Sequence, residues 1–409
     1  GQPLRAAYVD ADRAHEYEAV GFVRAATTGA TTAIVLLLAP PSNEPASLRS
    51  LAWPRYGPKR AVTALFTSGS TGLPKPRWFA DQNWVDRNPR AASGRPFASC
   101  APVFQPLSHG LARRQVWREI SHGGRIGMVD TTDELIRQIG LFEPSGVTAI
   151  PSFFVLLQDR FRAHLAAAAA AAGRAPDEPP TEAEEAAAYK AVNALFGPRV
   201  MHIAVGGAIV PKPLLEFLTE AFGIGGPGGG NAAVMDGYGA TETGGIARNG
   251  EVLEGVQVRL ERPTTTELPE GLGEILVRTN RSQIVAAVDA DGWYHTGDLG
   301  RWVERDDGKP PRLEVCDRLA FAIKLANGEF VCPTQLESLF ESRCASVAEC
   351  CVLASSGADA TVAVVVPRAA AAASEESVLS EMRRAATQAG CRPYELPAAV
   401  VIDGGGPWN

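Results

Sequence analysis

Short apolar runs alternate with amphipathic segments through the middle of the chain. Three such pairs follow one another, each an apolar run with a helical pattern behind it. This order is typical of strands joined by crossover helices, so it predicts an α/β fold with a largely parallel sheet. The pairs are 125–130 with 132–142, 147–152 with 153–172, and 200–207 with 211–222.

The pattern changes after Glu251, where short strand-like runs separated by turns predict a β-rich part. Beyond Cys316 we expect a small α+β unit. The sequence therefore predicts a large unit of residues 1–316, with parallel or mixed sheets, helices and a β-rich subdomain. A small unit of residues 317–409 follows it.

Two stretches between these elements read as loops. Residues 173–185 are polar and contain proline, which predicts a surface loop leading into another helix. Residues 223–231 are glycine-rich and contain a GxGxxG match. A dinucleotide-binding fingerprint needs a strand before it and a helix behind it, whereas here a helical pattern precedes and a strand-like run follows. We therefore expect an ordinary loop.

Composition excludes two classes of partner. The chain has 409 residues, is 45% hydrophobic and 21% charged, and carries a formal net charge of -7. Because no Lys/Arg block is present, we expect no nucleic-acid partner. Its longest apolar runs fall short of a bilayer span, so we expect no transmembrane segment. The 7 cysteines are scattered without a CxxC pair, which favours free thiols in a reducing, intracellular compartment, cytoplasmic or organellar.

Residues 65–79, "LFTSGSTGLPKPRWF", concentrate hydroxyls, glycines and a lysine between apolar flanks. Such loops hold phosphate groups, because glycines let backbone N–H groups converge on an anion. A Walker loop would need Ser or Thr after Lys75, where this chain has Pro76. A GxSxG nucleophile elbow would need glycine where Ser68 stands before Ser70. Both of those alternatives are excluded.

The stretch "TSGSTGLPK" (67–75) resembles the phosphate loop of the adenylate-forming superfamily, and further motifs of that superfamily follow in order. Among its subfamilies, the chain is most similar to the adenylation domain of carboxylic acid reductases, followed by long-chain acyl-CoA synthetases. The further motifs are "PLSHG" (106–110), "VGGA" (205–208), "DGYGATETGG" (236–245), "GEILVR" (273–278), "YHTGDLG" (294–300) and "DRLAFAIKLANGEFV" (317–331).

The resemblance implies how ATP and Mg²⁺ would be held. Tyr238 would stack on adenine, Thr241 would bond phosphate, and Glu242 would ligand Mg²⁺ as a hard oxygen donor. The loop residues that would cradle the β and γ phosphates are Thr67, Ser68, Gly69, Ser70, Thr71, Gly72 and Lys75.

Other positions would complete the site. Asp298 offers two acceptor oxygens for a ribose diol, and Arg318 a forked donor for ribose or phosphate. His109 would lie beside the substrate carboxylate. Gly206 and Gly207 would let adenine or the acyl group approach, although a tight strand-to-helix turn explains them equally well. Apolar candidates for an acyl pocket, more typical of core, are Phe153, Phe154 and Ile209.

The implied reaction is ATP-dependent activation of a carboxylic acid, fatty or aromatic, to an acyl-adenylate with release of pyrophosphate. Lys75, His109, Thr241 and Glu242 would be the catalytic residues. The acyl group would pass to the thiol of coenzyme A or phosphopantetheine, with carrier-protein and reductase domains as possible partners.

The chain also departs from the family pattern. Ala320 stands where the family has a polar hinge residue, and Pro76 replaces a glycine. The first sixty or so residues match only the end of the N-terminal subdomain, and we expect the catalytic-lysine loop to lie beyond Asn409. A non-catalytic fold reused as a structural or nucleotide-binding subunit of a larger assembly is therefore the alternative.

Overall fold

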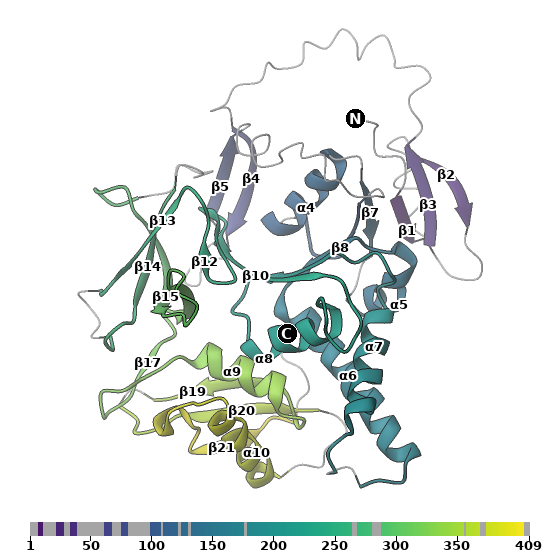
Figure 1. Ribbon diagram of the computed structural model, residues 1–409. Helices are drawn as coiled ribbons and strands as arrows, with labels where there is room; N and C mark the ends of the chain where they lie inside the picture. The colour runs from purple at the N-terminus through teal and green to yellow at the C-terminus, as the bar shows by residue number, and fades with distance from the viewer. Residues whose placement is uncertain are drawn as a thin grey trace.

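The computed structural model shows a mixed α/β molecule (Figure 1). Among the described residues, none of the helices combines the length and apolar character that a bilayer span requires. The residues that the structure describes are 7–10, 22–27, 33–38, 61–67, 75–80, 99–107, 109–121, 124–129, 132–175, 178–263, 268–279, 288–355, 357–368 and 374–404.

A five-stranded sheet forms the middle of the molecule, in the order β12-β11-β10-β9-β8. β8, β9 and β10 are parallel, whereas β11 runs antiparallel to β10. This mixed sheet confirms the predicted fold class. Its strands are β8 (Gly146–Ala149), β9 (His202–Gly206), β10 (Ala233–Ala240), β11 (Gly244–Arg248) and β12 (Glu251–Val252).

Four helices pack with this sheet around one apolar cluster, in which Phe153, Phe154 and Leu157 are buried. α6 begins at Pro151, where the missing N–H costs nothing, and its alanine-rich end extends the helix as expected. The helices are α5 (Thr132–Phe142), α6 (Pro151–Ala171), α7 (Glu182–Ala194) and α8 (Lys212–Phe222).

The loop predicted over 173–185 is four residues too long, because α7 begins at Glu182. Thr181 and Glu184 form a capping box, in which each side chain bonds the other residue's backbone N–H. The T-x-x-E spacing is the sequence signature of such a start. It could have located the boundary of the helix.

The glycine-rich stretch 223–231 is a loop, as predicted, and it folds back over the end of α8. The Gly228 N–H donates to Glu220 O at 3.0 Å. A Cβ on Gly228 or Gly230 would lie 2.1 Å from the carbonyl oxygens of Ala221 and Phe222. The glycines are therefore required by close backbone packing rather than by a nucleotide.

A second five-stranded sheet has the order β2-β3-β1-β7-β6, and α4 (Gly110–Ser121) contacts its β6 and β7. β4 (Ala61–Thr67) and β5 (Lys75–Ala80) form a separate antiparallel pair. The strands of the sheet are β1 (Ala7–Asp10), β2 (Phe22–Thr27), β3 (Ala33–Leu38), β6 (Cys100–Val103) and β7 (Arg125–Met128).

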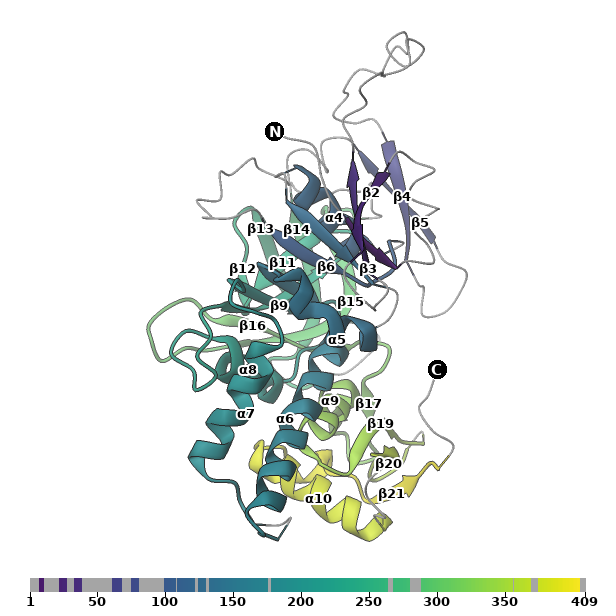
Figure 2. The ribbon, with the colours of Figure 1, turned by 90° about the vertical axis from the view of Figure 1, so that its right-hand side faces the viewer.

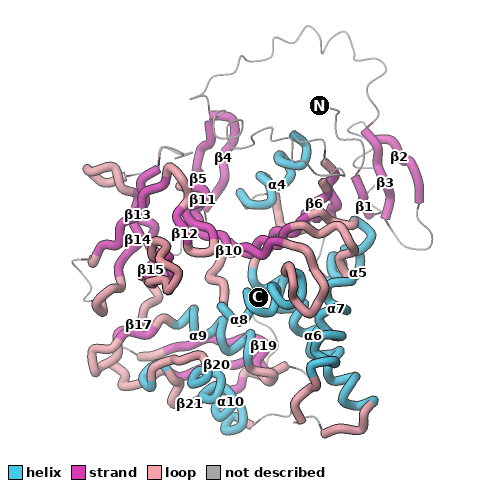
Figure 3. The backbone as a smooth tube through the Cα atoms, in the orientation of Figure 1, coloured by secondary structure: helices cyan, strands magenta, loops and turns pink. Residues whose placement is uncertain are grey.

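Four antiparallel strands, β13 to β16, make the β-rich part, a region of strands and loops (Figure 3). β16 runs through the predicted unit boundary to Arg318, and Ala320 lies exposed in the turn behind it. The division at residue 317 stays a prediction. The strands are β13 (Val256–Glu261), β14 (Gly273–Thr279), β15 (Tyr294–Val303) and β16 (Arg312–Arg318).

The C-terminal α+β part has its own apolar cluster, which begins at Ile323 and ends at Ile402. β19, β20 and β21 form its sheet, covered by α9 and α10. Its elements are β17 (Ile323–Lys324), β18 (Phe330–Val331), α9 (Pro333–Arg343), β19 (Val347–Leu353), β20 (Val362–Pro367), α10 (Glu375–Gln388), the 3₁₀ turn Pro393–Glu395 and β21 (Ala399–Ile402).

The C-terminal part packs against α6 and α8 (Figures 1 and 2). Asp159 of α6 accepts from Arg162 at 3.0 Å and also pairs with Arg368, which follows β20. Arg162 in turn donates to the carbonyl of Ser342 at the end of α9. The Asp159 carboxylate thus pairs with one arginine of α6 and with one of the C-terminal part.

All 7 cysteines are free thiols, as expected. Burial raises the pKa of Cys100 and of Cys391 to about 11, and that of Cys316 and of Cys344 to about 12. The pKa of each of the other three is raised as well, again mainly by burial.

Candidate nucleotide site

Asp298 lies at the centre of a polar constellation drawn from three strands. The Tyr238 hydroxyl of β10 donates to Asp298 Oδ2 at 2.7 Å. Arg318 Nε of β16 lies 3.0 Å from Asp298 Oδ1, and the two residues are register partners. The structure therefore brings together three residues that the sequence predicted for one site.

Burial sets the electrostatics of this constellation. Asp298 is 7% exposed, and burial raises its pKa, with the Tyr238 hydrogen bond and the Arg318 charge opposing that rise. Burial and the neighbouring Asp298 charge raise the pKa of Tyr238 well above its ordinary value, so the phenol stays a donor. Arg318 keeps 60% of its side chain exposed. It can therefore meet a ligand from solvent while it pairs with Asp298.

The Thr241–Glu242–Thr243 turn joins β10 to β11, and Tyr238 lies near the end of β10. Ala240 and Gly244 are register partners that close this three-residue loop, and Gly244 has a φ of 75°. Glu242 is only 7% exposed within it.

Glu242 has the chemistry of a magnesium ligand. Mg²⁺ takes one or two carboxylates and completes its octahedron with phosphate oxygens and water. Glu242 therefore fits the role as a single ligand that shares the ion with a nucleotide. No group of three or more His, Cys, Asp or Glu side chains that could cage a metal occurs in the described part of the chain.

The predicted phosphate loop connects β4 to β5. Thr67 and Lys75 are register partners at the end of this pair that the loop connects. Pro76 pairs with Phe66 near the start of β5, where a proline is tolerated. Five of the predicted phosphate-binding residues lie outside the described residues: Ser68, Gly69, Ser70, Thr71 and Gly72.

His109 is exposed just before α4, where its carbonyl accepts from the Arg113 N–H at 3.2 Å. Gly206 ends β9, and a Cβ on it would lie 2.5 Å from Gly237 O. Gly207 has a φ of 85°. Both glycines are therefore required by strand packing and by a left-handed turn, whatever their part in binding.

The acyl-pocket candidates separate into two kinds. Phe153 and Phe154 are 1% and 0% exposed in the apolar cluster, so they are core residues. Ile209 is half-buried in the segment between β9 and α8.

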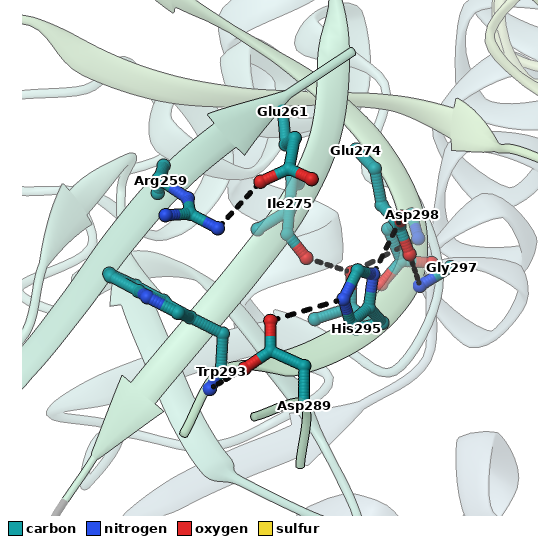
Figure 4. A network of polar contacts seen from close by, with 10 residues as sticks. Arg259, Glu261, Glu274, Ile275, Asp289, Trp293, His295, Gly297 and Asp298 are labelled. Atoms are coloured by element: carbon teal, nitrogen blue, oxygen red, sulfur yellow. Dashed lines mark hydrogen bonds and ion pairs between the residues drawn. The ribbon is translucent and has the colours of Figure 1, made fainter. Parts of the chain in front are cut away.

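Two further buried carboxylates, Glu274 and Asp317, lie close to Asp298 and were not predicted as site residues. Glu274 of β14 is 9% exposed and accepts from Gly297 N at 3.1 Å (Figure 4). Asp317, beside Arg318, is 1% exposed and accepts from Thr334 N at 2.9 Å. Both stand inside motifs, "GEILVR" and "DRLAF", which is the signal that could have found them.

The chain belongs to the AMP-binding enzyme family, whose family model matches residues 13–284. It is 26% identical over 373 residues to a carboxylic acid reductase from Mycobacterium marinum. The matched region covers 84% of this chain and 30% of that protein. It is also 25% identical over 353 residues to long chain acyl-CoA synthetase 6, peroxisomal, from Arabidopsis thaliana. That match covers 75% of this chain and 48% of that protein.

The fold is shared with a solved structure, the A-PCP didomain of a carboxylic acid reductase from Segniliparus rugosus in complex with AMP. The TM-score is 0.70 at 22% identity, with 86% of this chain and 50% of that chain covered. This chain thus spans about a third to a half of the length of the curated relatives named above.

Proposed function

We propose that this chain uses ATP to activate a carboxylic acid as an acyl-adenylate, releasing pyrophosphate. Its membership of the AMP-binding family supports this, and the observation that carries it is the joining of Tyr238, Arg318 and the buried Asp298. A carboxylate with two fixed acceptor oxygens suits a ribose diol, and the adjacent exposed guanidinium suits a phosphate.

The reaction needs little from the protein beyond positioning and charge neutralisation. An oxygen of the acid attacks the α-phosphorus, and the bond from that phosphorus to the pyrophosphate oxygen breaks. Lys75 and Thr67, paired at the loop end of β4 and β5, would hold the departing phosphates. Mg²⁺, when bound, offsets phosphate charge, and Glu242 would be its protein ligand.

We further propose that His109 lies near the acid, that Thr241 contacts phosphate, and that the Tyr238 ring stacks on adenine. The acceptor would be the thiol of coenzyme A or of a phosphopantetheine arm. Carrier-protein and reductase domains would be its partners, by analogy with the carboxylic acid reductases it resembles. The seven free thiols favour a reducing, intracellular compartment.

An ATP–pyrophosphate exchange assay tests the proposal. The full-length gene product is offered a panel of fatty and aromatic acids, and we expect acid-dependent exchange with at least one of them. Glu242→Gln removes a charged oxygen from the buried turn and is expected to lower Mg²⁺-dependent exchange by about 100-fold. Glu254→Gln, at an exposed position, is the matched control. ATP binding without exchange for any acid would contradict the proposed reaction.

A further inference from the structure

The pairing of β14 with β15 is interrupted by a β-bulge that contains Asp298. Leu276 pairs with His295 on one side and Glu274 with Leu299 on the other. Between these pairs β14 has one residue, whereas β15 has three, residues 296–298. Extra residues in one strand redirect its side chains, and such bulges are frequent at functional sites. Asp298 is the last residue of this bulge.

Two amides of the bulge, those of Gly297 and Asp298, donate to side chains that fix its shape. Gly297 adopts a φ of 72° and donates its N–H to Glu274 Oε1 at 3.1 Å. The Asp298 N–H donates to Thr296 Oγ1 at 3.0 Å, and that hydroxyl donates to Ile275 O at 2.7 Å. Glu274 is the only charged side chain among these partners.

The other oxygen of Glu274 is also engaged (Figure 4). Glu274 Oε2 lies 3.0 Å from His295 Nδ1, and His295 Nε2 lies 3.5 Å from Asp289 Oδ2. Asp289 itself accepts from the Trp293 N–H at 2.8 Å. A buried carboxylate costs free energy unless it is hydrogen-bonded, and here both of its oxygens are. Glu274 is therefore held in one place from two sides.

The carbonyl of Gly297 completes the connection, because it accepts from the Leu319 N–H at 2.8 Å. Gly297 thus donates its N–H to Glu274 and accepts at its C=O from Leu319, the residue after Arg318. A shift of this peptide would move Asp298 relative to both of its partners, Tyr238 and Arg318.

We propose that Glu274 is a positioning residue for Asp298: it fixes the preceding peptide and so sets where the Asp298 oxygens meet a ribose diol. Glu274 acts without touching the nucleotide. The inference rests on the proposed function, in which Asp298 binds the ribose.

The test compares ATP with 2′,3′-dideoxy-ATP, which lacks the diol, by calorimetric titration of the full-length protein. Wild type is expected to bind ATP more tightly than the dideoxy analogue. Glu274→Ala removes the acceptor for Gly297 and is expected to weaken ATP binding by about 10-fold, as for a lost hydrogen bond to a charged group. Its affinity for the dideoxy analogue should stay unchanged, because no diol is positioned there. A merely structural loss would weaken both nucleotides equally and would overturn the proposal.

Two further variants sharpen the comparison. Glu274→Gln keeps an amide oxygen for the Gly297 N–H and is expected to bind ATP within about threefold of wild type. Glu261→Ala is the matched control, because Glu261 pairs with Glu274 across β13 and β14 but its carboxylate bonds the half-buried Arg259 instead. It should leave both affinities unchanged. Loss of diol discrimination in this control would overturn the assignment to Glu274.

A double-mutant cycle separates this proposal from the proposed function. In an Asp298→Ala background, Glu274→Ala should cost no further ATP affinity, whereas an additive loss would overturn the positioning role. A wild-type protein that does not discriminate the two nucleotides would overturn the ribose assignment and this inference together. Discrimination in wild type that survives intact in Glu274→Ala would overturn the inference alone.

Discussion

Asp317, the penultimate residue of β16, caps the N-terminus of α9 by accepting hydrogen bonds from Thr334. Asp317 Oδ2 accepts from Thr334 N at 2.9 Å, and Oδ1 accepts from Thr334 Oγ1 at 2.7 Å. α9 has no side-chain cap of its own, because Cys332 precedes it and Pro333 begins it. The orphan N–H groups of a helix start need such acceptors. The strand that carries Arg318 is therefore fastened to the C-terminal part by one buried carboxylate.

Asp317→Ala should accordingly destabilise the protein. Asp317 is 1% exposed and also accepts from the Arg318 N–H at 2.7 Å, so its loss leaves partly buried donors at Thr334 and Arg318 unpaired. We expect the free energy of unfolding to fall by about 2–4 kcal/mol, and by less in Asp317→Asn, which keeps one acceptor oxygen. Urea denaturation measures both. A change below about 0.5 kcal/mol for Asp317→Ala would show that the cap is dispensable.

Tyr238→Phe should shift the pH range in which ATP binds. The Tyr238 hydroxyl stabilises the charged form of Asp298, so its removal raises the pKa of Asp298 further. Because the ionised carboxylate is the better acceptor, ATP affinity should begin to fall at a higher pH in the variant than in wild type as the solution is acidified. Titrations from pH 8 to 5 measure this shift. Superimposable profiles would contradict a role for the hydroxyl.

Asp159→Ala should loosen the contact between α6 and the C-terminal part. Its removal leaves Arg162 and Arg368 facing each other with like charge. The group is 38% exposed, so a double-mutant cycle with Arg368→Ala should give a coupling of only about 1 kcal/mol. Hydrogen exchange in α6 and α9 should rise. Arg160→Ala, at an exposed position beside Asp159, is the control that should leave exchange unaltered.

Glu341 should make stability depend on pH. Burial raises its pKa from 4.5 to about 7, with the neighbouring Glu337 and Glu349 adding to the rise and its hydrogen bond from Cys350 N opposing it. The folded state therefore holds this proton more tightly than the unfolded state. The resulting stability is fully present below pH 4.5 and is lost as the pH rises towards 7.

The variant Glu341→Gln checks this, because it keeps an oxygen to accept the Cys350 N–H but cannot ionise. Thermal unfolding midpoints of wild type should decline between pH 5 and 7 more steeply than those of the variant. Equal slopes would mean that other groups set the pH dependence.

Much of the fold could be predicted because its units are local. β7 with α5, β8 with α6 and β9 with α8 each follow from an apolar run and the helical pattern behind it. Tyr238 and Asp298 could be predicted as site residues because the motifs "DGYGATETGG" and "YHTGDLG" contain them. In the three strand–helix units, sequence neighbours are also neighbours in space, whereas Tyr238 and Asp298, 60 residues apart, could be named only from their motifs.

What could not be predicted depends on pairings between distant residues. Glu274 stands in the motif "GEILVR", but its hydrogen bond with Gly297 depends on the bulge of β15, which the sequence does not reveal. Asp159 and Arg368 are 209 residues apart in sequence, and no local pattern marks them as partners. The hydrogen bonds by which Asp317 ties β16 to α9 also join residues 17 apart, Asp317 and Thr334.

The buried thiols have a practical consequence for anyone who labels this protein. A thiol whose pKa is about 11, such as that of Cys391, presents very little thiolate to a maleimide dye at neutral pH. A cysteine introduced on an exposed surface, with an ordinary pKa near 8.5, would present on the order of a hundred times more. Cys391 can therefore stay in place while two introduced cysteines, one on α6 and one on α10, carry the pair of dyes that reports the distance between these helices.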